Sequence, residues 1–206
     1  LTERLLMKEA IELAPPKGWI RAEKVRILPI TEQESAWHLR SLNSAINRLG
    51  KLQASNLFMT LMGNFRIFSR WILFASSLMP YGELKRRETE LIILRVAWNC
   101  RCQYEWAQHK QISQQVGLTE HDLLNVTIGS DGFPKDSCEA LLMLSCDEFH
   151  HQRMISEKTW QMLTRFYSDK DLLEILMVIG HYEMLAGILN STGIAVDDHL
   201  ISKNGI

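Results

Sequence analysis

Two buried helices are predicted by the sequences ETELIILR at residues 88–95 and CQYEWAQH at residues 102–109, the second of which is followed by GLT at residues 117–119. The run 91–94 is apolar on every face, so this helix, over 84–99, is expected in the protein interior or at a subunit interface. Glu88 and Glu90 stand in its first turns, where carboxylates suit the helix dipole. Gly117 ends the second helix, which we place at 102–116.

The regions on either side of this pair also carry helix signals. The segment 65–78 is apolar on so many faces that it is predicted to be a largely buried helix. Thr119 and the polar run 168–171 are capping sequences for further helices, the second of which extends to Leu189. Helices are also predicted for 140–149 and from Ser156 onward. Strand alternation is absent from the sequence, so we predict an all-α bundle with short connections.

The chain divides into an N-terminal arm at residues 1–30 and a single helical domain at residues 31–206. A short amphipathic stretch at 5–13 precedes the sequence APPKG at 14–18, which stops any helix. Thr31 and Glu34 fit a capping box, and a helix should follow to Leu49, with Gly50 as its stop.

Composition excludes several classes of function. Lys and Arg total 23 against 24 for Asp and Glu, so no net positive charge favours nucleic acid or an anionic membrane as partner. The longest uncharged apolar run, 71–82, is shorter than the roughly 20 residues that span a bilayer. The first residues lack a secretory signal, and we therefore expect a cytoplasmic protein with no membrane partner.

The four cysteines are expected to be reduced thiols. The sequence has neither paired Cys-x-x-Cys motifs nor His-x-x-x-His spacing, so we predict no metal site and no cofactor. Cys138 and Cys146 are interpreted as structural thiols of the helix at 140–149.

Cys102, Glu105 and His109 form the candidate catalytic group. At about 100° per residue, His109 lies within roughly 20° of Cys102 around the helix, and Glu105 lies about 60° away. The helix dipole and a protonated His109 would favour the Cys102 thiolate, whereas Glu105 would oppose it. Without any comparison, the same stripe also fits a buried cysteine, a solvated carboxylate and a histidine at the core margin.

These residues carry a family resemblance. Glu90, Cys102 and His109, at intervals of twelve and seven, match the Glu, first Cys and His of the alkyl hydroperoxidase D-like motif. The sequence is similar to the carboxymuconolactone decarboxylase and alkyl hydroperoxidase D-like superfamily over about 31–198. The resemblance implies an all-helical fold of that type, homo-oligomers (dimer, trimer or hexamer) and Glu90 as a further catalytic carboxylate.

The chain departs from the peroxidase branch at Glu105, which stands where the second cysteine of a redox-active Cys-x-x-Cys pair would be. The motif therefore cannot close a disulfide of its own, as the usual peroxidase cycle requires. In the decarboxylase branch a Glu four residues before the His is expected, and Glu105 with His109 looks like that pattern.

Three other features concern thiol and histidine side chains outside this group. Cys100 as a resolving thiol for Cys102 would demand local unwinding, because residues two apart on a helix diverge by about 200°. His150 and His151 fit a solvated helix end better than a metal site. His181, on the last long helix, is a candidate for lining the pocket from a neighbouring element.

Three functions follow as hypotheses. The leading one is a thiol-dependent, peroxiredoxin-type peroxidase in antioxidant defence, with Cys102 as nucleophile, His109 as proton shuttle, Glu105 and Glu90 as relaying carboxylates, and an unknown thiol reductant. The second is a decarboxylase or isomerase of a small carboxylated lactone that uses Glu105 and His109, with Arg95 or Arg101 on the substrate carboxylate. The third is a non-catalytic oligomeric binding protein.

Overall fold

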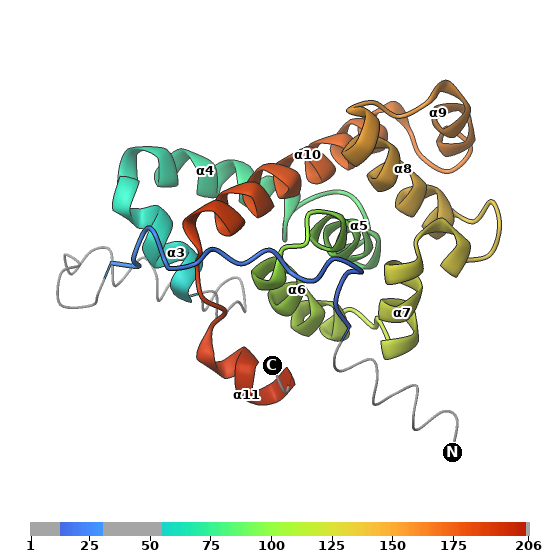
Figure 1. Ribbon diagram of the computed structural model, residues 1–206. Helices are drawn as coiled ribbons and strands as arrows, with labels where there is room; N and C mark the ends of the chain where they lie inside the picture. Colours follow the sequence, from blue (N-terminus) through green and yellow to red (C-terminus); the bar gives the residue numbers. More distant parts are fainter. Residues whose placement is uncertain (1–12, 31–54, 205–206) are drawn as a thin grey trace, which may run out of the picture.

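The computed structural model describes residues 13–30 and 55–204, and the regular elements in these ranges are all helical (Figure 1). The predicted all-α class is thus confirmed. The capping box and helix predicted from Thr31 to Leu49, and most of the amphipathic stretch at 5–13, lie outside the described residues. The described helices are α3 (Ser55–Leu61), α4 (Phe65–Leu78), α5 (Arg86–Asn99), α6 (Gln103–Gln115), α7 (Glu120–Ile128), α8 (Cys138–Gln152), α9 (Glu157–Leu163), α10 (Asp169–Thr192) and α11 (Asp198–Asn204), with short 3₁₀ turns at Met62–Asn64 and Ser130–Gly132.

Helix ends follow the capping residues in the sequence. The Thr119 side chain accepts from the backbone N–H of Asp122, and Ser168 does the same with Asp171; each forms a full capping box. Ser156 caps α9 as predicted. Gly117 follows α6 at a φ of +86°, a left-handed conformation that favours glycine, and therefore gives that helix a sharp stop.

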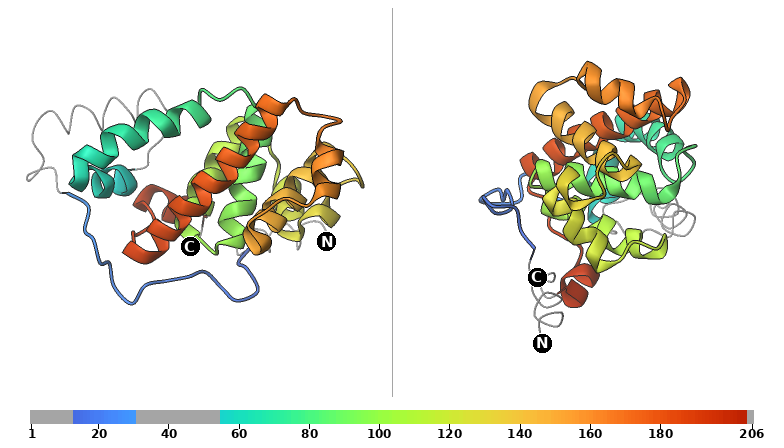
Figure 2. Two further views of the ribbon diagram at one scale, coloured as in Figure 1. Left: turned by 90° about the horizontal axis from the view of Figure 1, so that it is seen from above. Right: turned by 90° about the vertical axis from the view of Figure 1, so that its right-hand side faces the viewer.

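Helix α5 is the centre of the molecule (Figure 1). It packs against α6, α8 and α10, and every residue from Glu88 to Ala97 is buried. The predicted interior helix is therefore confirmed. Helix α10 crosses the bundle beside α5 (Figure 2) and has the length and apolar composition of a membrane span. Half of that apolar window is buried inside the fold, as is usual for a core helix.

Helix α4 differs from its prediction. It was expected to be largely buried, but only Phe68 and Leu78 are buried, whereas Ile67 is 54% and Leu73 71% exposed. The reason is its place at the edge of the bundle, where it contacts α3, α10 and the 3₁₀ turn between α3 and α4 (Figure 1). The apolar sequence predicted burial on several faces of the helix. Within the described chain, only one face is buried.

Residues 13–30 run along the outside of the helical bundle without regular structure (Figure 2). Arg101 fixes this segment, since its Nε donates to the Gly18 carbonyl at 2.6 Å. Trp19 packs its ring against Trp98 and Trp106, with centroids 5.8 and 5.9 Å away.

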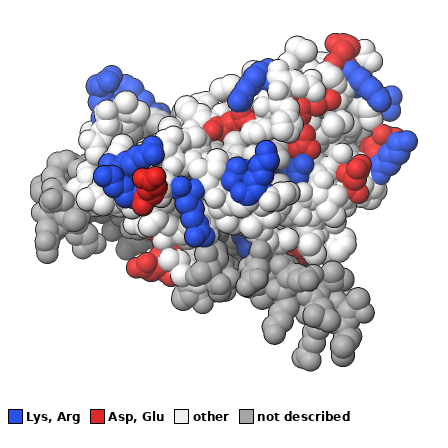
Figure 3. All heavy atoms as spheres, in the orientation of Figure 1, with Lys and Arg blue, Asp and Glu red and all other residues white. Residues whose placement is uncertain are grey.

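On the face drawn in Figure 3, cationic and anionic side chains are interspersed.

Candidate functional site

A cavity of about 210 Å³ lies between α3, α4, α6 and α10. Its wall is mostly aliphatic and aromatic, with a few polar groups contributed by α6 and α10. These polar groups are Tyr104, Glu105, Gln108, His109, His181 and Tyr182. A mainly apolar cavity with a few converging polar groups is the usual form of a small-molecule site.

Glu105 is the most unusual group on this wall. Its residue is 2% exposed, and neither carboxyl oxygen has a hydrogen-bond partner in the described structure. Burial raises the pKa of Glu105 well above its usual value. The side chain is therefore a neutral carboxylic acid over an extended pH range, with one proton to donate to a molecule in the cavity.

His109 is held by a chain of charged partners. Its Nδ1 lies 2.7 Å from Oε2 of Glu90, which is fully buried, and Oε1 of Glu90 accepts from Arg86 at 2.9 Å. Because Nδ1 donates to this carboxylate, Nε2 is the ring nitrogen left for a molecule in the cavity. The ring also meets Tyr182 edge-on at 5.2 Å, which fixes its orientation.

His181 lines the same cavity from α10, as the sequence suggested. Its ring stacks on Trp71 at a centroid distance of 6.0 Å, and its Nδ1 is buried without a partner. Burial, followed by the nearby His109, lowers the pKa of His181 to about 4. His181 is therefore a neutral imidazole near pH 7.

Cys102, unlike Glu105, His109 and His181, does not lie on the cavity wall. It is the N-cap residue of α6, is fully buried, and is not among the described residues that line the cavity. Burial, and then the Glu105 carboxyl, raises the pKa of the thiol, although backbone N–H groups of Glu105 and Tyr104 partly offset this. The opposing effect of Glu105 on the thiolate was expected from the sequence, whereas the larger effect of burial was not.

Cys100 is a free thiol, as is Cys102, so no disulfide joins them. Burial, and then Glu183, raises the pKa of Cys100 to about 12. Its sulfur approaches His150 on α8 and not the cavity.

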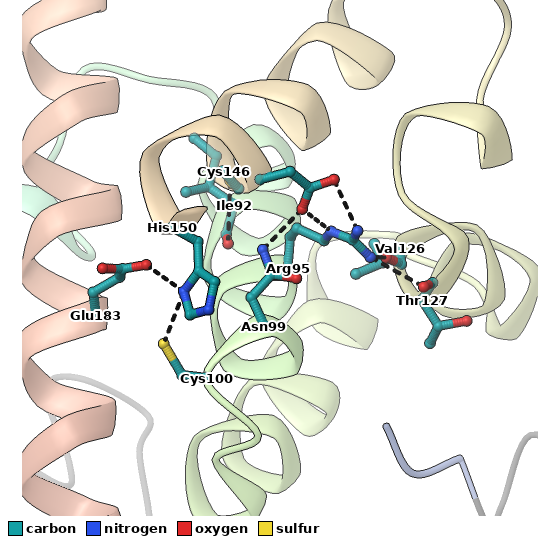
Figure 4. A network of polar contacts seen from close by, with 10 residues as sticks. Ile92, Arg95, Asn99, Cys100, Val126, Thr127, Cys146, His150 and Glu183 are labelled. Carbon is teal, nitrogen blue, oxygen red and sulfur yellow. Dashed lines mark hydrogen bonds and ion pairs between the residues drawn. The ribbon is translucent and has the colours of Figure 1, made fainter. Parts of the chain in front are cut away.

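The two arginines considered for a substrate carboxylate are engaged elsewhere. Arg95 forms a bidentate pair with Asp147 at 2.7 and 2.8 Å and donates to the Val126 carbonyl (Figure 4). Arg101 holds the segment 13–30. Neither lines the cavity, so this part of the decarboxylase hypothesis is corrected.

Sequence reasoning missed a buried network beside the acid. The Tyr104 hydroxyl and the Gln108 amide both donate to Oδ2 of Asp197 at 2.6 Å. Tyr104 and Gln108 share a face of α6 at i,i+4 spacing, which was a usable signal. Asp197 is far away in sequence, and no local pattern indicates it.

Comparisons with known proteins agree with this architecture. Residues 66–130 match the model of the Carboxymuconolactone decarboxylase family. An uncharacterized peroxidase-related protein from Silicibacter sp. has a similar structure, with a TM-score of 0.75, 16% identity and coverage of 87% of this chain and 95% of that one. A peroxidase-related alkylhydroperoxidase core protein from Ralstonia eutropha is also similar, with a TM-score of 0.72 and 15% identity. The match covers 90% of this chain and 99% of that one.

A third similar structure is the debrominase Bmp8, with a TM-score of 0.69, 11% identity and coverage of 89% and 98%. No curated protein matches the sequence. At these identities the structural matches show the fold, and the region matched by the family model contains Glu90, Cys102 and His109, the residues that carry the resemblance.

Proposed function

We propose that this chain is a member of the carboxymuconolactone decarboxylase and alkyl hydroperoxidase D-like superfamily, and that it is an acid–base enzyme that moves protons on a small, weakly polar carbonyl compound. The observation that carries the proposal is the neutral, unpartnered carboxyl of Glu105 on a cavity wall shared with His109. An acid and a base with separated proton affinities are the requirement for such a transfer.

In the proposed reaction Nε2 of His109 takes the proton from the carbon beside the carbonyl. Glu105 at the same time donates its proton to the carbonyl oxygen, and a neutral enol results. The imidazolium then returns its proton to another carbon, while the Glu105 carboxylate recovers the oxygen-bound proton. Glu90 stabilises the transient imidazolium through the Nδ1 hydrogen bond. Both residues end in their starting forms.

The charge of the cavity wall favours a neutral substrate. Among the described residues that line it, there is no lysine or arginine. A substrate carboxylate would enter an apolar space without a guanidinium partner, which is costly. A lactone or enone without a carboxylate therefore fits better, and isomerisation is favoured over decarboxylation.

Thiol peroxidase chemistry is the second candidate, supported by the contacts of Cys102. Its sulfur accepts from two backbone N–H groups at the start of α6, and it lies close enough to Glu105 for their charges to interact. A thiolate there would attack a peroxide oxygen to give a sulfenic acid, and His109 would protonate the alcohol or water that leaves. Two equivalents of an external thiol would then release water and a disulfide.

Two assays on one variant set test these proposals. An unsaturated γ-lactone, with and without a carboxyl group, is incubated in D₂O, and exchange of its carbon-bound hydrogens is followed by NMR. Hydrogen peroxide consumption is measured with dithiothreitol as reductant. We expect exchange to be lost in Glu105→Gln and His109→Gln and retained in Cys102→Ala. Glu157→Gln, on the surface of α9, is the matched control.

The outcomes separate the hypotheses. Exchange that survives in both Glu105→Gln and His109→Gln rules out the acid–base reaction. Peroxide consumption that disappears in Cys102→Ala supports the thiol peroxidase instead. If the wild-type protein does neither, the non-catalytic binding protein is the remaining hypothesis.

A further inference from the structure

A second cluster of reactive side chains lies outside the cavity, where three helices meet. It consists of Cys100 at the C-terminal end of α5, His150 on α8 and Glu183 on α10 (Figure 4). Their ligand atoms, Sγ, Nδ1 and a carboxylate oxygen, all lie within 4.8 Å of one another. Figure 4 shows the three side chains pointing toward one another. None of the three lines the cavity that contains Glu105.

We propose that Cys100, His150 and Glu183 bind a divalent zinc-like cation through one sulfur, one nitrogen and one oxygen atom. A thiolate and an imidazole select a borderline-soft ion such as Zn²⁺, while Mg²⁺ and Ca²⁺ prefer all-oxygen sets. Three protein ligands leave one position of a tetrahedral ion open.

The distances are close to those that such an ion requires. With metal bonds of about 2.3 Å to sulfur and 2.0–2.1 Å to nitrogen and oxygen, tetrahedral ligand atoms lie roughly 3.4–3.6 Å apart. The Cys100 Sγ is 3.8 Å from the His150 Nδ1, which is already near this value. The Glu183 Oε1 is 2.7 Å from the same nitrogen and must retreat by about half an ångström or more.

Ion binding needs two small local changes. The Nδ1 proton that bridges His150 and Glu183 must leave, so that His150 carries its proton on Nε2 and the Nδ1 lone pair binds the ion. The Cys100 thiol loses its proton to solvent, since only the thiolate is a ligand. Arg153 pairs with the other oxygen of Glu183, and its exposed side chain can keep this contact and orient the carboxylate.

The surroundings supply both rigidity and access. The Asn190 amide donates to the Cys100 carbonyl at 3.0 Å and holds that ligand in place. The cluster borders a groove of about 810 Å³ that also contains Arg21, Arg26 and Arg153. The open coordination position would therefore take a water molecule or an anionic group, because the neighbouring charges are positive.

Cobalt(II) is the probe for this site, since it replaces Zn²⁺ in tetrahedral sites and reports on sulfur ligation by a thiolate-to-cobalt charge-transfer band. The purified full chain, freed of metal by a chelator, is titrated with Co²⁺ and then with Zn²⁺. We expect a band that saturates near one Co²⁺ per chain and is abolished by equimolar Zn²⁺. The melting temperature should rise with Zn²⁺, because the ion joins three helices.

Matched variants decide whether the three residues are the ligands. Cys100→Ala and His150→Ala should lose the band, while the neighbouring His151→Ala should keep it. Cys138→Ala is the thiol control, because Cys138 is also half-buried beside a carboxylate, that of Glu139, at 3.2 Å. Glu183→Gln provides a conservative third test if either alanine variant fails to fold by circular dichroism.

The proposal is overturned if wild-type protein shows no saturable sulfur-to-cobalt band. It is equally overturned if the band persists in Cys100→Ala or Glu183→Gln, or if it disappears only in Cys138→Ala. Because the readout is spectroscopic and needs no substrate, it stands or falls separately from the proposed proton transfer at Glu105.

Discussion

Replacement of Glu105 by glutamine should make the protein more stable, and increasingly so as the pH rises. Glu105 is buried with both oxygens unpaired, and its folded-state pKa is raised by burial. In the unfolded chain the carboxyl ionises near the ordinary value of 4.5. Glutamine has nearly the same shape and does not titrate, so the comparison isolates the ionisation of one group.

The sign and size follow from proton linkage. Between pH 4.5 and the raised pKa, the folded wild type retains a proton that the unfolded chain has released. Raising the pH in this window therefore favours unfolding of the wild type, by up to about 1.4 kcal/mol per pH unit. Below pH 4.5 the carboxyl is protonated in both states, and the Glu105→Gln variant differs little from the wild type. The stabilisation by Glu105→Gln should thus begin near pH 5 and grow steadily.

Urea unfolding at several pH values from 4 to 8, at one protein concentration and 25 °C, measures this difference. The exposed substitution Glu157→Gln serves as the control and should give a difference that changes little with pH. A Glu105→Gln difference that is equally flat above pH 5 would show that Glu105 ionises in the folded protein as readily as in water. The neutral acid on which the proposed proton transfer depends would then be absent.

Three further outcomes are expected. Asp147→Asn should lower the free energy of unfolding by about 3 kcal/mol in urea titrations, because it leaves the buried guanidinium of Arg95 without its carboxylate. Gly129→Ala should cost roughly 1–3 kcal/mol in the same assay, since its φ is +94° and a methyl group there would lie 2.6 Å from Nη2 of Arg95. In timed iodoacetamide labelling near pH 7, read by mass spectrometry, Cys102 should react more slowly than the half-buried Cys138, because burial denies Cys102 both access and ionisation.

Local sequence signals predicted most helix ends, because capping is itself a local interaction. Thr119 and Ser168 lie directly before the helices that they cap, and each acts on an amide three residues later. Burial depends on tertiary packing and was harder to predict from the sequence. Helix α5 was correctly predicted to be interior, whereas in the apolar helix α4 the side chain of Leu73 is exposed. Hydrophobic composition indicates that a helix packs against other elements. It does not indicate what fraction of the helix surface is buried within one chain.

The candidate site was predictable only where its residues share a helix. Glu105 and His109 follow from helical spacing along α6, and Glu90 came from the family resemblance, which placed it twelve residues before Cys102. The effect of burial on the pKa of Cys102 could not be predicted, because desolvation depends on atoms from other helices.

The proposed cation ligands were missed for the same reason as Asp197. Cys100, His150 and Glu183 come from three helices that are distant in sequence, and only packing brings them together. The prediction that the chain has no metal site used spacing within single helices, which cannot register such a cluster.

Helix α10 serves as the common wall of two compartments. His181 faces the apolar cavity, and Glu183, two residues later and roughly 200° around the helix, faces the arginine-bordered groove. A ligand that displaced α10 on one side would therefore change the shape of the compartment on the other side. Any such coupling would be reciprocal, since the factor by which the first ligand changed the affinity of the second would equal the factor by which the second changed the affinity of the first.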